Sequence, residues 1–419
     1  MTFLARQATV SGGNALVALL AAISAQNLLA TNIMVPALSA IGDELGASAA
    51  TLKLTLTLFF ITYAGSLLAY GPLSDRYGRR PVLICSLIIY CTGSVVCATS
   101  ASAAALIGGR MIQGLGAGGG TIIAWAAARD CFAGPVLLRT TSLINTGRSI
   151  VPAIAPAAGG VIVDCYGWRY TFGAAGVLGG LMLGSTLVFL PETLRSAAKA
   201  EAFESVICTY LLLLKSLRFL AFALAAAFSL GAWFAFIAGS PTLFMQRLGL
   251  SPTEFGLCPT LIASGSVLGG FVTARLANAA LGSNRLAYLG FATLLLGAAG
   301  TLAVIALDIT SVASIVVPMF AVSFGCGIVF PLMAANAMTL SAERAGTGFS
   351  LIGFLTMVVA AVSTALTTAN PRHAAQVFAV VMVGSATASI AGYWFAIHPS
   401  HSQPSARAGA SIMPTSDRH

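Results

Sequence analysis

The chain has 419 residues, of which 58% are hydrophobic and only 8% are charged, and its formal net charge is +9. Soluble domains carry about 25% charged residues, so this composition excludes a soluble globular protein and indicates a surface solvated by lipid. At roughly 20 residues per membrane-spanning helix, the length accommodates about twelve spans and excludes a sizeable additional soluble domain.

Apolar runs separated by short polar segments predict twelve spanning helices. They are expected near residues 15–38, 52–71, 82–100, 103–126, 138–162, 169–190, 219–243, 255–276, 286–306, 311–338, 346–368 and 374–397. Charge density rises in residues 191–218, which are predicted to form a cytoplasmic linker between two six-helix bundles, residues 1–190 and 219–397. The Ser- and Pro-rich residues 398–419 are predicted to form a disordered cytoplasmic tail. The fold class is therefore an all-α integral membrane protein.

Basic residues are distributed unevenly between alternate loops. With the N-terminus inside, fifteen Lys and Arg residues fall in inner segments. The outer segments hold only Lys53, Arg169, Arg247 and Arg372. This bias predicts that both termini are cytoplasmic, and it explains the net positive charge as a topology signal, so nucleic acid is not expected as a partner.

Cysteine and histidine placement argues against metal and disulfide chemistry. The eight cysteines are scattered without a C-x-x-C pair, and all four histidines lie from His373 onward. Neither a disulfide framework nor a metal site is expected, and no organic cofactor is implied.

The segment between the second and third predicted spans is the most informative stretch of the chain. Residues 71–81 read GPLSDRYGRRP, and four charges in six residues cannot lie in hydrocarbon. A short polar hairpin is expected, in which Gly71 and Gly78 permit close backbone approach and positive φ and Asp75 pairs with a neighbouring arginine.

This pattern, G-x-L-x-D-R-x-G-R-R, resembles the loop signature of the major facilitator superfamily of transporters. The resemblance implies two helical bundles that rock about a central site near the midplane, with Asp75 latching the bundles on the cytoplasmic side. The residues expected to act in gating are Gly71, Asp75, Arg76, Gly78, Arg79 and Arg80. The alternative is that the arginines only mark the cytoplasmic face.

Two arginines are predicted to lie inside the membrane. Arg110 and Gln113 belong to the sequence RMIQG, which resembles the R-x-x-Q-G signature of the same superfamily. A cation at that depth is costly, so Arg110 should face a cavity or a partner; the alternative is that it snorkels to the interface. Arg148 falls near the middle of the fifth span, where it either faces the cavity or bonds carbonyls loosened by Pro152, or Asn145 and neighbouring amides.

The fifth span carries two prolines and several small residues, and it resembles the antiporter signature of drug exporters. Prolines bend a helix and small residues permit tight helix contact, so this helix is predicted to seal the two halves against leak. A generic crossing site is the alternative. The residues concerned are Gly147, Pro152, Pro156, Gly159 and Gly160.

Residues 31–38 read TNIMVPAL, and with the features above they resemble the bicyclomycin- and chloramphenicol-exporting drug:proton antiporters. The usual pattern in that family reads TDMYLPA, so Asn32 replaces an aspartate. The resemblance implies proton coupling and the proton gradient as coupling ion. Asn32 cannot carry a proton, however, and every acidic residue falls in a predicted loop, tail or helix end.

Polar and aromatic side chains recur at helical spacing in the second and seventh spans, around Tyr63 and around Trp233 and Phe236. Such stripes are either packing or part of a ligand pocket, which mixes aromatic residues with a few polar groups. The residues expected to line the substrate cavity are Asn32, Tyr63, Arg110, Gln113, Arg148, Trp233 and Phe236.

These features predict a secondary transporter of the bacterial inner membrane that exports small, neutral or anionic, aromatic molecules such as phenicols. A monomer is expected, with the substrate and the lipid bilayer as its partners. One alternative exports an endogenous metabolite or siderophore without proton coupling through the first helix. A polytopic membrane enzyme would need deep acids or histidines, which the chain lacks, and a sensor would need a signalling domain.

Overall fold

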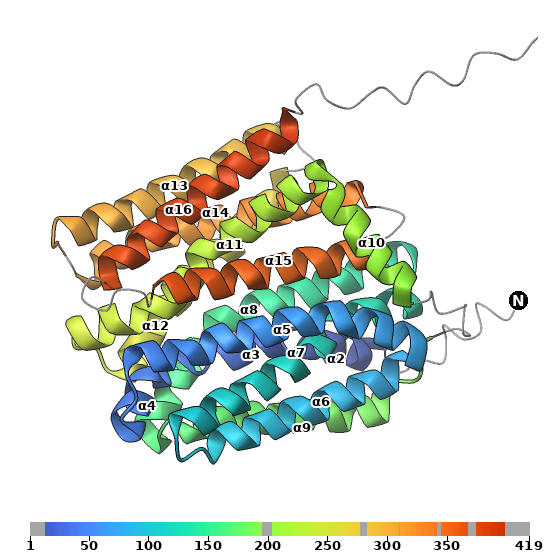
Figure 1. Cartoon of the computed structure of the whole chain (residues 1–419), viewed down its shortest axis with the longest axis horizontal. Coiled ribbons are helices and arrows are strands. Elements are labelled where there is room, and N and C mark those ends of the chain that lie inside the picture. The colour runs from blue at the N-terminus through green and yellow to red at the C-terminus, as the bar shows by residue number, and fades with distance from the viewer. Residues whose placement is uncertain are drawn as a thin grey trace, which may run out of the picture.

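The computed structural model describes residues 13–194, 203–276, 283–309, 311–341, 345–367 and 374–398. These residues are almost wholly helical, and no strand occurs among them. Figure 1 shows two groups of long helices, the N-terminal half in blue to green and the C-terminal half in light green, through yellow, to red. The predicted tail, apart from His398, lies outside the described residues.

The N-terminal half contains six of the predicted spans, and the first is interrupted. Its elements are α2 (Gly13–Ser24), α3 (Gln26–Asn32), the short turn η1 (Val35–Ala37), α4 (Leu38–Leu45), α5 (Ala49–Tyr77), α6 (Arg79–Ala98), α7 (Ala103–Cys131), α8 (Gly134–Tyr166) and α9 (Arg169–Phe189). The first predicted span therefore becomes α2, α3, η1 and α4, with a break at Ala25 and a second at η1, where Pro36 cannot donate a helix hydrogen bond.

The C-terminal half supplies the other six spans and one additional helix. Its elements are α10 (Phe203–Lys215), α11 (Leu217–Pro241), η2 (Thr242–Arg247), α12 (Pro252–Leu276), α13 (Ser283–Ala306), α14 (Val312–Thr339), α15 (Ala345–Leu366) and α16 (Ala374–Ile397). The predicted linker contains α10, a helix that the expectation of a polar link did not include. With 13 residues, α10 is about 20 Å long and too short to cross the hydrocarbon. Leu213 and Tyr210 pack it against the rest of this half.

Eleven of the described helical segments are long and apolar enough to cross a membrane. The remaining predicted span, expected at residues 103–126, is α7. Its glycines and polar residues lower its hydropathy although it has 29 residues. It lies between α5 and α6, with an added Cβ at Gly114 meeting Phe59 of α5 and one at Gly116 meeting the backbone of Tyr90 on α6. These glycines let three helices approach closely. The predicted all-α, twelve-span fold is confirmed.

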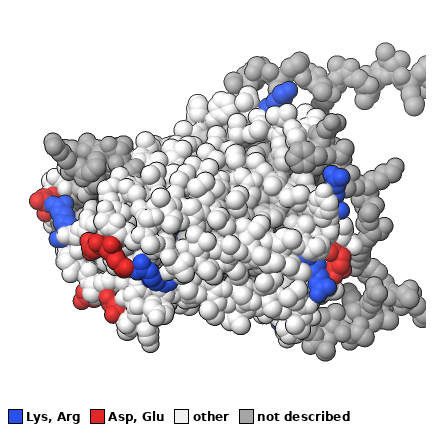
Figure 2. All heavy atoms as spheres, turned by 60° about the horizontal axis from the view of Figure 1, so that its bottom comes forward, with Lys and Arg blue, Asp and Glu red and all other residues white. Residues whose placement is uncertain are grey.

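Charge separates the molecule into two ends and a belt. On the face shown in Figure 2, basic and acidic residues lie towards the two ends and the broad surface between them is uncharged. This distribution suits a protein surrounded by hydrocarbon. We call the two ends the α4 end and the α10 end, after the helices seen at the left and right of Figure 1.

The two halves meet along α5 with α15 and along α8 with α12. Between these two contacts, Phe60 of α5 packs edge-on against Phe234 of α11, with ring centroids 5.0 Å apart. Both rings are buried. The interface is therefore formed by pairs of long helices from opposite halves, with aromatic packing between them.

Candidate functional site

The charged segment between α5 and α6 is more helical than predicted. α5 continues to Tyr77 and α6 begins at Arg79, so a single residue, Gly78, makes the turn at φ 99°. An L side chain rarely adopts this backbone conformation, which explains the glycine. The expected hairpin over residues 71–81 is therefore wrong in its extent, because the helices retain their hydrogen bonds up to the turn.

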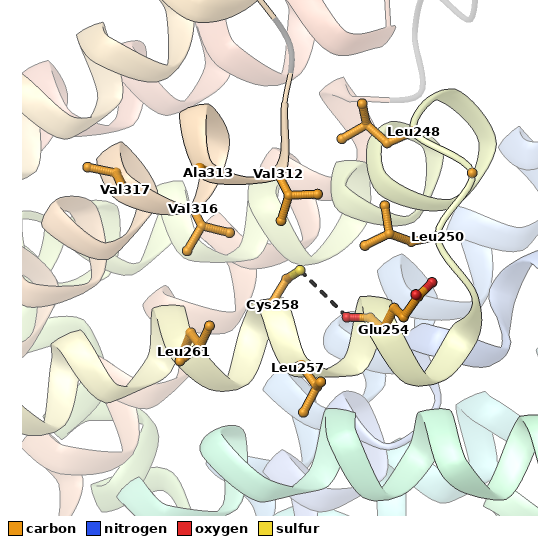
Figure 3. A pocket seen from close by; sticks show the side chains of 11 residues that line it. Leu248, Leu250, Glu254, Leu257, Cys258, Leu261, Val312, Ala313, Val316 and Val317 are labelled. Atoms are coloured by element: carbon orange, nitrogen blue, oxygen red, sulfur yellow. Dashed lines mark hydrogen bonds between the residues drawn. The ribbon is translucent and has the colours of Figure 1, made fainter.

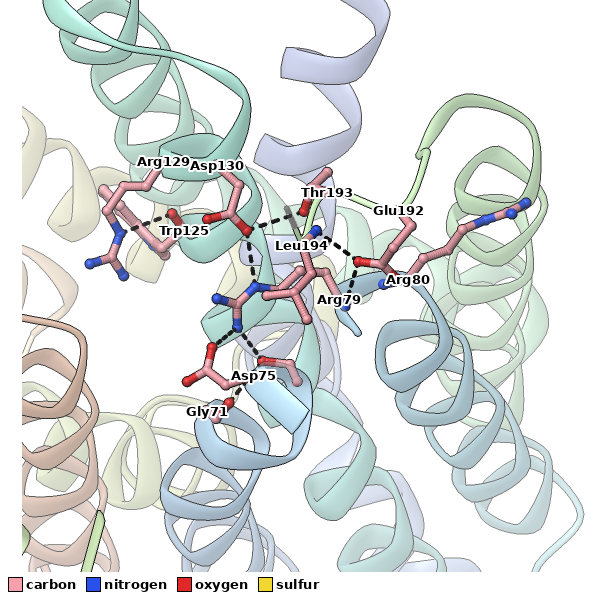
Figure 4. A network of polar contacts seen from close by, with 11 residues as sticks. Gly71, Asp75, Arg79, Arg80, Trp125, Arg129, Asp130, Glu192, Thr193 and Leu194 are labelled. Atoms are coloured by element: carbon pink, nitrogen blue, oxygen red, sulfur yellow. Dashed lines mark hydrogen bonds and ion pairs between the residues drawn. The ribbon is translucent and has the colours of Figure 1, made fainter. Parts of the chain in front are cut away.

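Arg79 is the centre of a polar network at the α10 end (Figure 4). Its guanidinium lies 2.5 Å from Asp75 and 3.1 Å from Asp130, and it donates to the hydroxyl of Ser74 at 2.6 Å. The Arg79 side chain is only 11% exposed. Pairing of Asp75 with a neighbouring arginine is thus confirmed, and Asp130 of α7 is a second partner that the sequence did not reveal.

Glu192, which follows α9, completes this network. Its carboxylate accepts hydrogen bonds from the backbone N–H groups of Arg79 at 3.0 Å and Arg80 at 3.2 Å. These are orphan donors at the amino end of α6, where an anion is favoured by the helix dipole. Thr193 donates to Asp130 at 3.2 Å. The network therefore joins α5, α6, α7 and the end of α9, all in the N-terminal half.

The other gating residues have lesser roles in this arrangement. Arg80 donates to the carbonyl of Leu187 at 2.7 Å. Arg76 is exposed and lies over the ring of Tyr77, with its guanidinium carbon 5.3 Å from the centroid. Gly71 faces Ser350 of α15 at ordinary contact distance. The ion pair of Asp75 lies within its own half, although its charge also acts on Tyr210 of α10 in the other half. Its action as a latch between halves remains a prediction.

Arg110 and Gln113 lie together inside the N-terminal half. Arg110 is completely buried, donates to Ala30 at 3.1 Å and to Gln113 at 2.5 Å, and lies 4.0 Å above the ring of Phe59. Gln113 in turn donates to Ser94 at 2.8 Å. This burial excludes the snorkelling alternative. The cation is held by a carbonyl, an amide and an aromatic face rather than by a carboxylate.

Arg148 and Tyr63 form a second polar cluster, around the break in the first span. Arg148 donates to the carbonyl of Ser24, the last residue of α2, and interacts with the Tyr63 hydroxyl. Tyr63 and Thr121 share a hydrogen bond of 2.9 Å, and Thr121 also donates to Ser24 at 3.4 Å. Arg148 therefore does bond a backbone carbonyl, as the alternative expected, and this carbonyl belongs to Ser24 of α2.

The remaining predicted cavity residues lie apart from these clusters. Asn32 is buried and donates to the carbonyl of Leu28 at 2.8 Å. Trp233 packs against Phe236 with centroids 5.6 Å apart, and Phe236 also contacts Phe244 and Phe378 within the C-terminal half. Sequence spacing did not single out Phe60 and Phe234, because contact between halves depends on which helices become neighbours.

The glycines of α8 face two different partners. A side chain at Gly159 would overlap the backbone of Ile33 in the same half, whereas one at Gly160 would overlap the carbonyl of Pro252 in the other half. One turn away, Gly256 of α12 lies in the same way against Pro156. Gly147 packs more loosely against Ala21. Close backbone contact between α8 and α12 is what small residues in membrane helices permit.

A cavity of about 840 Å³ lies at the α4 end of the C-terminal half, between α12 and α14 (Figure 3). Its lining is apolar apart from Glu254, and it includes the exposed side chains of Leu257, Leu261 and Val317. None of the predicted site residues lines it. Across the described part of the chain, no cluster of three His, Cys, Asp or Glu side chains could hold a metal ion.

The long apolar helices and the uncharged belt (Figure 2) define a polytopic membrane protein, and the family match makes it a transporter rather than an enzyme. The chain belongs to the Major Facilitator Superfamily, whose family model matches residues 20–364. It is an integral membrane protein of that superfamily, as the loop signature implied.

Curated relatives include drug-resistance proteins of bacteria. The chain is 29% identical to the chloramphenicol resistance protein of Pseudomonas aeruginosa over 77% of its own length and 74% of the relative's. It is 27% identical to multidrug resistance protein D of Escherichia coli, over 85% of this chain and 89% of that one. An uncharacterized MFS-type transporter, YdgK of Bacillus subtilis, is 27% identical over 90% of this chain and 94% of the relative.

Solved structures share the fold. A bacterial homologue of the human lysosomal transporter Spinster, in an inward-facing and occupied conformation, matches with a TM-score of 0.69 and 15% identity, covering 92% of this chain and 96% of that one. The D-xylose–proton symporter matches with a TM-score of 0.69 and 14% identity, over 89% and 96% of the two chains. Both support the two-bundle architecture.

Proposed function

We propose that this transporter exports small, neutral or anionic molecules that carry an aromatic ring, by alternating access of the two halves. Relatives named for chloramphenicol and multidrug resistance support a role in drug efflux. A phenicol, which is neutral and rich in oxygen acceptors, fits this class, whereas a quaternary ammonium dye does not.

The observation that carries the proposal is the Arg148 cluster. Arg148 is a half-buried cation beside two hydroxyls, and each described acidic residue lies at a helix end or in a connection. In a site shielded from water, two unit charges at 4 Å interact by about 4 kcal/mol at an effective dielectric near 20. The guanidinium therefore repels cations and can exchange its Ser24 carbonyl partner for a carboxylate, nitro or carbonyl oxygen of the substrate.

Proton coupling is part of the proposal and has weaker support. The resemblance to drug:proton antiporters favours it, but Asn32 occupies the usual aspartate position and cannot titrate. Asp130, the next carboxylate to consider, accepts hydrogen bonds from Arg79 and Thr193. Export of an endogenous metabolite or siderophore without coupling through the first helix is therefore the second candidate function, and Asn32 is the residue that favours it.

We further infer that the α10 end faces the cytoplasm of a bacterial cell, with the protein monomeric in the inner membrane. The excess of basic residues in the segments assigned to that side supports this orientation. Relatives from Escherichia coli and Pseudomonas aeruginosa support a bacterial membrane.

The test is a side-by-side export assay of a phenicol and a quaternary ammonium dye in a strain stripped of its efflux pumps, with and without a proton uncoupler. We expect export of the phenicol only, and a loss of about tenfold or more in Arg148→Ala. Arg139→Ala is the matched control, because Arg139 is an exposed cation on the same helix. Efficient dye export, together with an Arg148→Ala variant that changes neither substrate, would contradict the proposal.

A further inference from the structure

At the α4 end, two charged side chains of the N-terminal half reach the ends of helices in the C-terminal half. Asp164, in the last turn of α8, accepts hydrogen bonds from the backbone N–H of Thr253, at 2.9 Å, and from its hydroxyl. Lys53, in the first turns of α5, donates to the carbonyl of Thr367 at 3.1 Å, just after α15 ends. These contacts lie on the two seams where the halves meet.

The first turn of α12 explains why a carboxylate is needed there. Ser251 and Glu254 form a reciprocal cap, the Ser251 hydroxyl accepting from the N–H of Glu254 and the Glu254 carboxylate accepting from the N–H of Ser251. Pro252 has no N–H, and Phe255 donates to the carbonyl of Ser251 at 2.8 Å. Thr253 thus has the one first-turn N–H that its own half does not satisfy, and Asp164 of the other half accepts from it.

The polarity of the two contacts is complementary. An anion lies at the amino end of α12 and a cation at the carboxyl end of α15, which is the favourable arrangement for both helix dipoles. Asp164 makes two hydrogen bonds at an exposed site, so it loses little hydration. Lys53 is only 6% exposed, and the cost of removing an ammonium from water offsets much of its gain. Asp164 should therefore contribute more than Lys53 to the stability of the contact between the halves.

We propose that Asp164 and Lys53 form a clamp that holds the α4 end closed, and that the transport cycle breaks and remakes it. The proposal rests on the alternating access described above. One turn before Asp164 in α8, the backbone contact of Gly160 with Pro252 leaves no space for a side chain. The ends of α8 and α12 are therefore held at a fixed position relative to each other. Opening at this end must separate Thr253 from Asp164 and leave one N–H of α12 to water.

The clamp can be tested by the distance between the halves, without any substrate. Spin labels are placed at Tyr170→Cys on α9 and Leu307→Cys after α13, both exposed at the α4 end, in a full-length chain whose exposed cysteines Cys85, Cys165 and Cys208 are serine. We expect Asp164→Ala, which removes the acceptor for Thr253, to raise the ratio of open to closed populations roughly threefold to tenfold, as for the loss of a helix cap. Lys53→Met should shift it less.

The matched control is Glu254→Gln, which removes a carboxylate from the same helix end without touching the contact between halves. Glutamine preserves a reciprocal cap, so this variant should keep the distances of the unmodified protein. Unchanged distances in Asp164→Ala, or an equal shift in Glu254→Gln, would overturn the proposal. A larger shift in Lys53→Met than in Asp164→Ala would overturn the ranking of the two residues.

A cross-link provides the opposite perturbation. Asp164→Cys with Thr253→Cys, in the Cys165→Ser background, should join the halves on treatment with a short thiol cross-linker and stop phenicol export, whereas either single variant should not respond. Export that persists after complete cross-linking would contradict the clamp. If distances shift as expected but no phenicol is exported, the clamp stands and the proposed substrate is wrong.

Discussion

The two ends of the interface between the halves are held differently. At the α10 end, the charged network of Arg79, Asp75 and Asp130 stays within the N-terminal half. At the α4 end, Asp164 and Lys53 cross to the other half. The stretch of sequence richest in charge is therefore not where charged side chains join the halves in this conformation.

The contacts that do cross at the α10 end are uncharged. Trp125 of α7 packs against Phe349 of α15 with centroids 5.5 Å apart, and Tyr210 of α10 donates to the carbonyl of Leu68 at 3.4 Å. Burial, with a contribution from the Asp75 charge, raises the pKa of the Tyr210 phenol above its ordinary value. An ordinary phenol is already protonated at neutral pH, so Tyr210 acts here as a hydrogen-bond donor.

This difference separates two roles for polar contacts. Contacts within a half persist when the halves move and keep that half rigid, whereas contacts across the interface are present in one conformation and absent in another. Only the second kind biases the equilibrium between conformations. Substitutions in the two kinds of contact should therefore affect transport differently.

Gly160→Leu should abolish export, because its side chain would displace Pro252 and separate the halves at the α4 end. Misplacement by about 1 Å can cost about 100-fold in rate, and we expect at least that loss in a vesicle transport assay. Gly173→Leu is the control, since an added Cβ there meets nothing within 4 Å. Gly159→Leu should also abolish export, but by a collision with Ile33 inside one half, and it should lower the melting temperature more. Export at the native rate in Gly160→Leu would show that close contact at Gly160 is not needed to seal the two halves.

Arg79→Ala should reduce export about tenfold or more and lower the free energy of unfolding by about 2 kcal/mol, because it removes the shared partner of Asp75 and Asp130. Arg79→Lys should export little better than Arg79→Ala, because an ammonium group cannot make the several contacts that the planar guanidinium makes at once. Asp75→Asn should also impair export while leaving membrane insertion intact. Arg76→Ala is the comparison, as Arg76 is exposed and stacks on Tyr77. A greater loss in Arg76→Ala than in Arg79→Ala would contradict the network.

Phe349→Leu tests the uncharged contact at the α10 end. Loss of an aromatic pair costs about 1 kcal/mol, so we expect a shift of about fivefold towards the conformation open at the α10 end, measured with distance labels at that end. The melting temperature of the full-length protein should change little. If Phe349→Leu instead favours opening at the α4 end, the assignment of Trp125 and Phe349 to this closure is wrong.

Asn32→Asp should give the smallest change in export. Asn32 belongs to neither set of contacts between the halves, and its amide donates a hydrogen bond to the carbonyl of Leu28. If Asn32 has replaced the proton site, as the second candidate function requires, export in the unmodified protein should depend weakly on the pH gradient, and the variant should depend on it more strongly, by about twofold in the ratio of rates with and without a gradient. A steep dependence in the unmodified protein that is insensitive to position 32 would show that another group carries the proton.

Much of the architecture follows from the sequence alone, for a simple physical reason. Hydrocarbon cannot satisfy backbone polar groups or charges, so apolar runs become spans and the charges fall at their ends. The lengths of the spans likewise suffice to place Arg110 and Arg148 inside the membrane. The cost of an unpaired charge suffices to predict that Asp75 pairs with an arginine. The twelve spans needed no knowledge of which helix lies beside which.

What the tertiary structure alone decided is the identity of the neighbours. The sequence did not reveal that Gly159 faces its own half while Gly160 faces the other, that Glu192 caps α6, or that Asp164 caps α12. Consecutive residues of a helix point to different sides, and a cap can come from any carboxylate that the fold brings near. The spans are set by the chemistry of each segment with lipid, whereas the gates are set by packing between segments far apart in the chain.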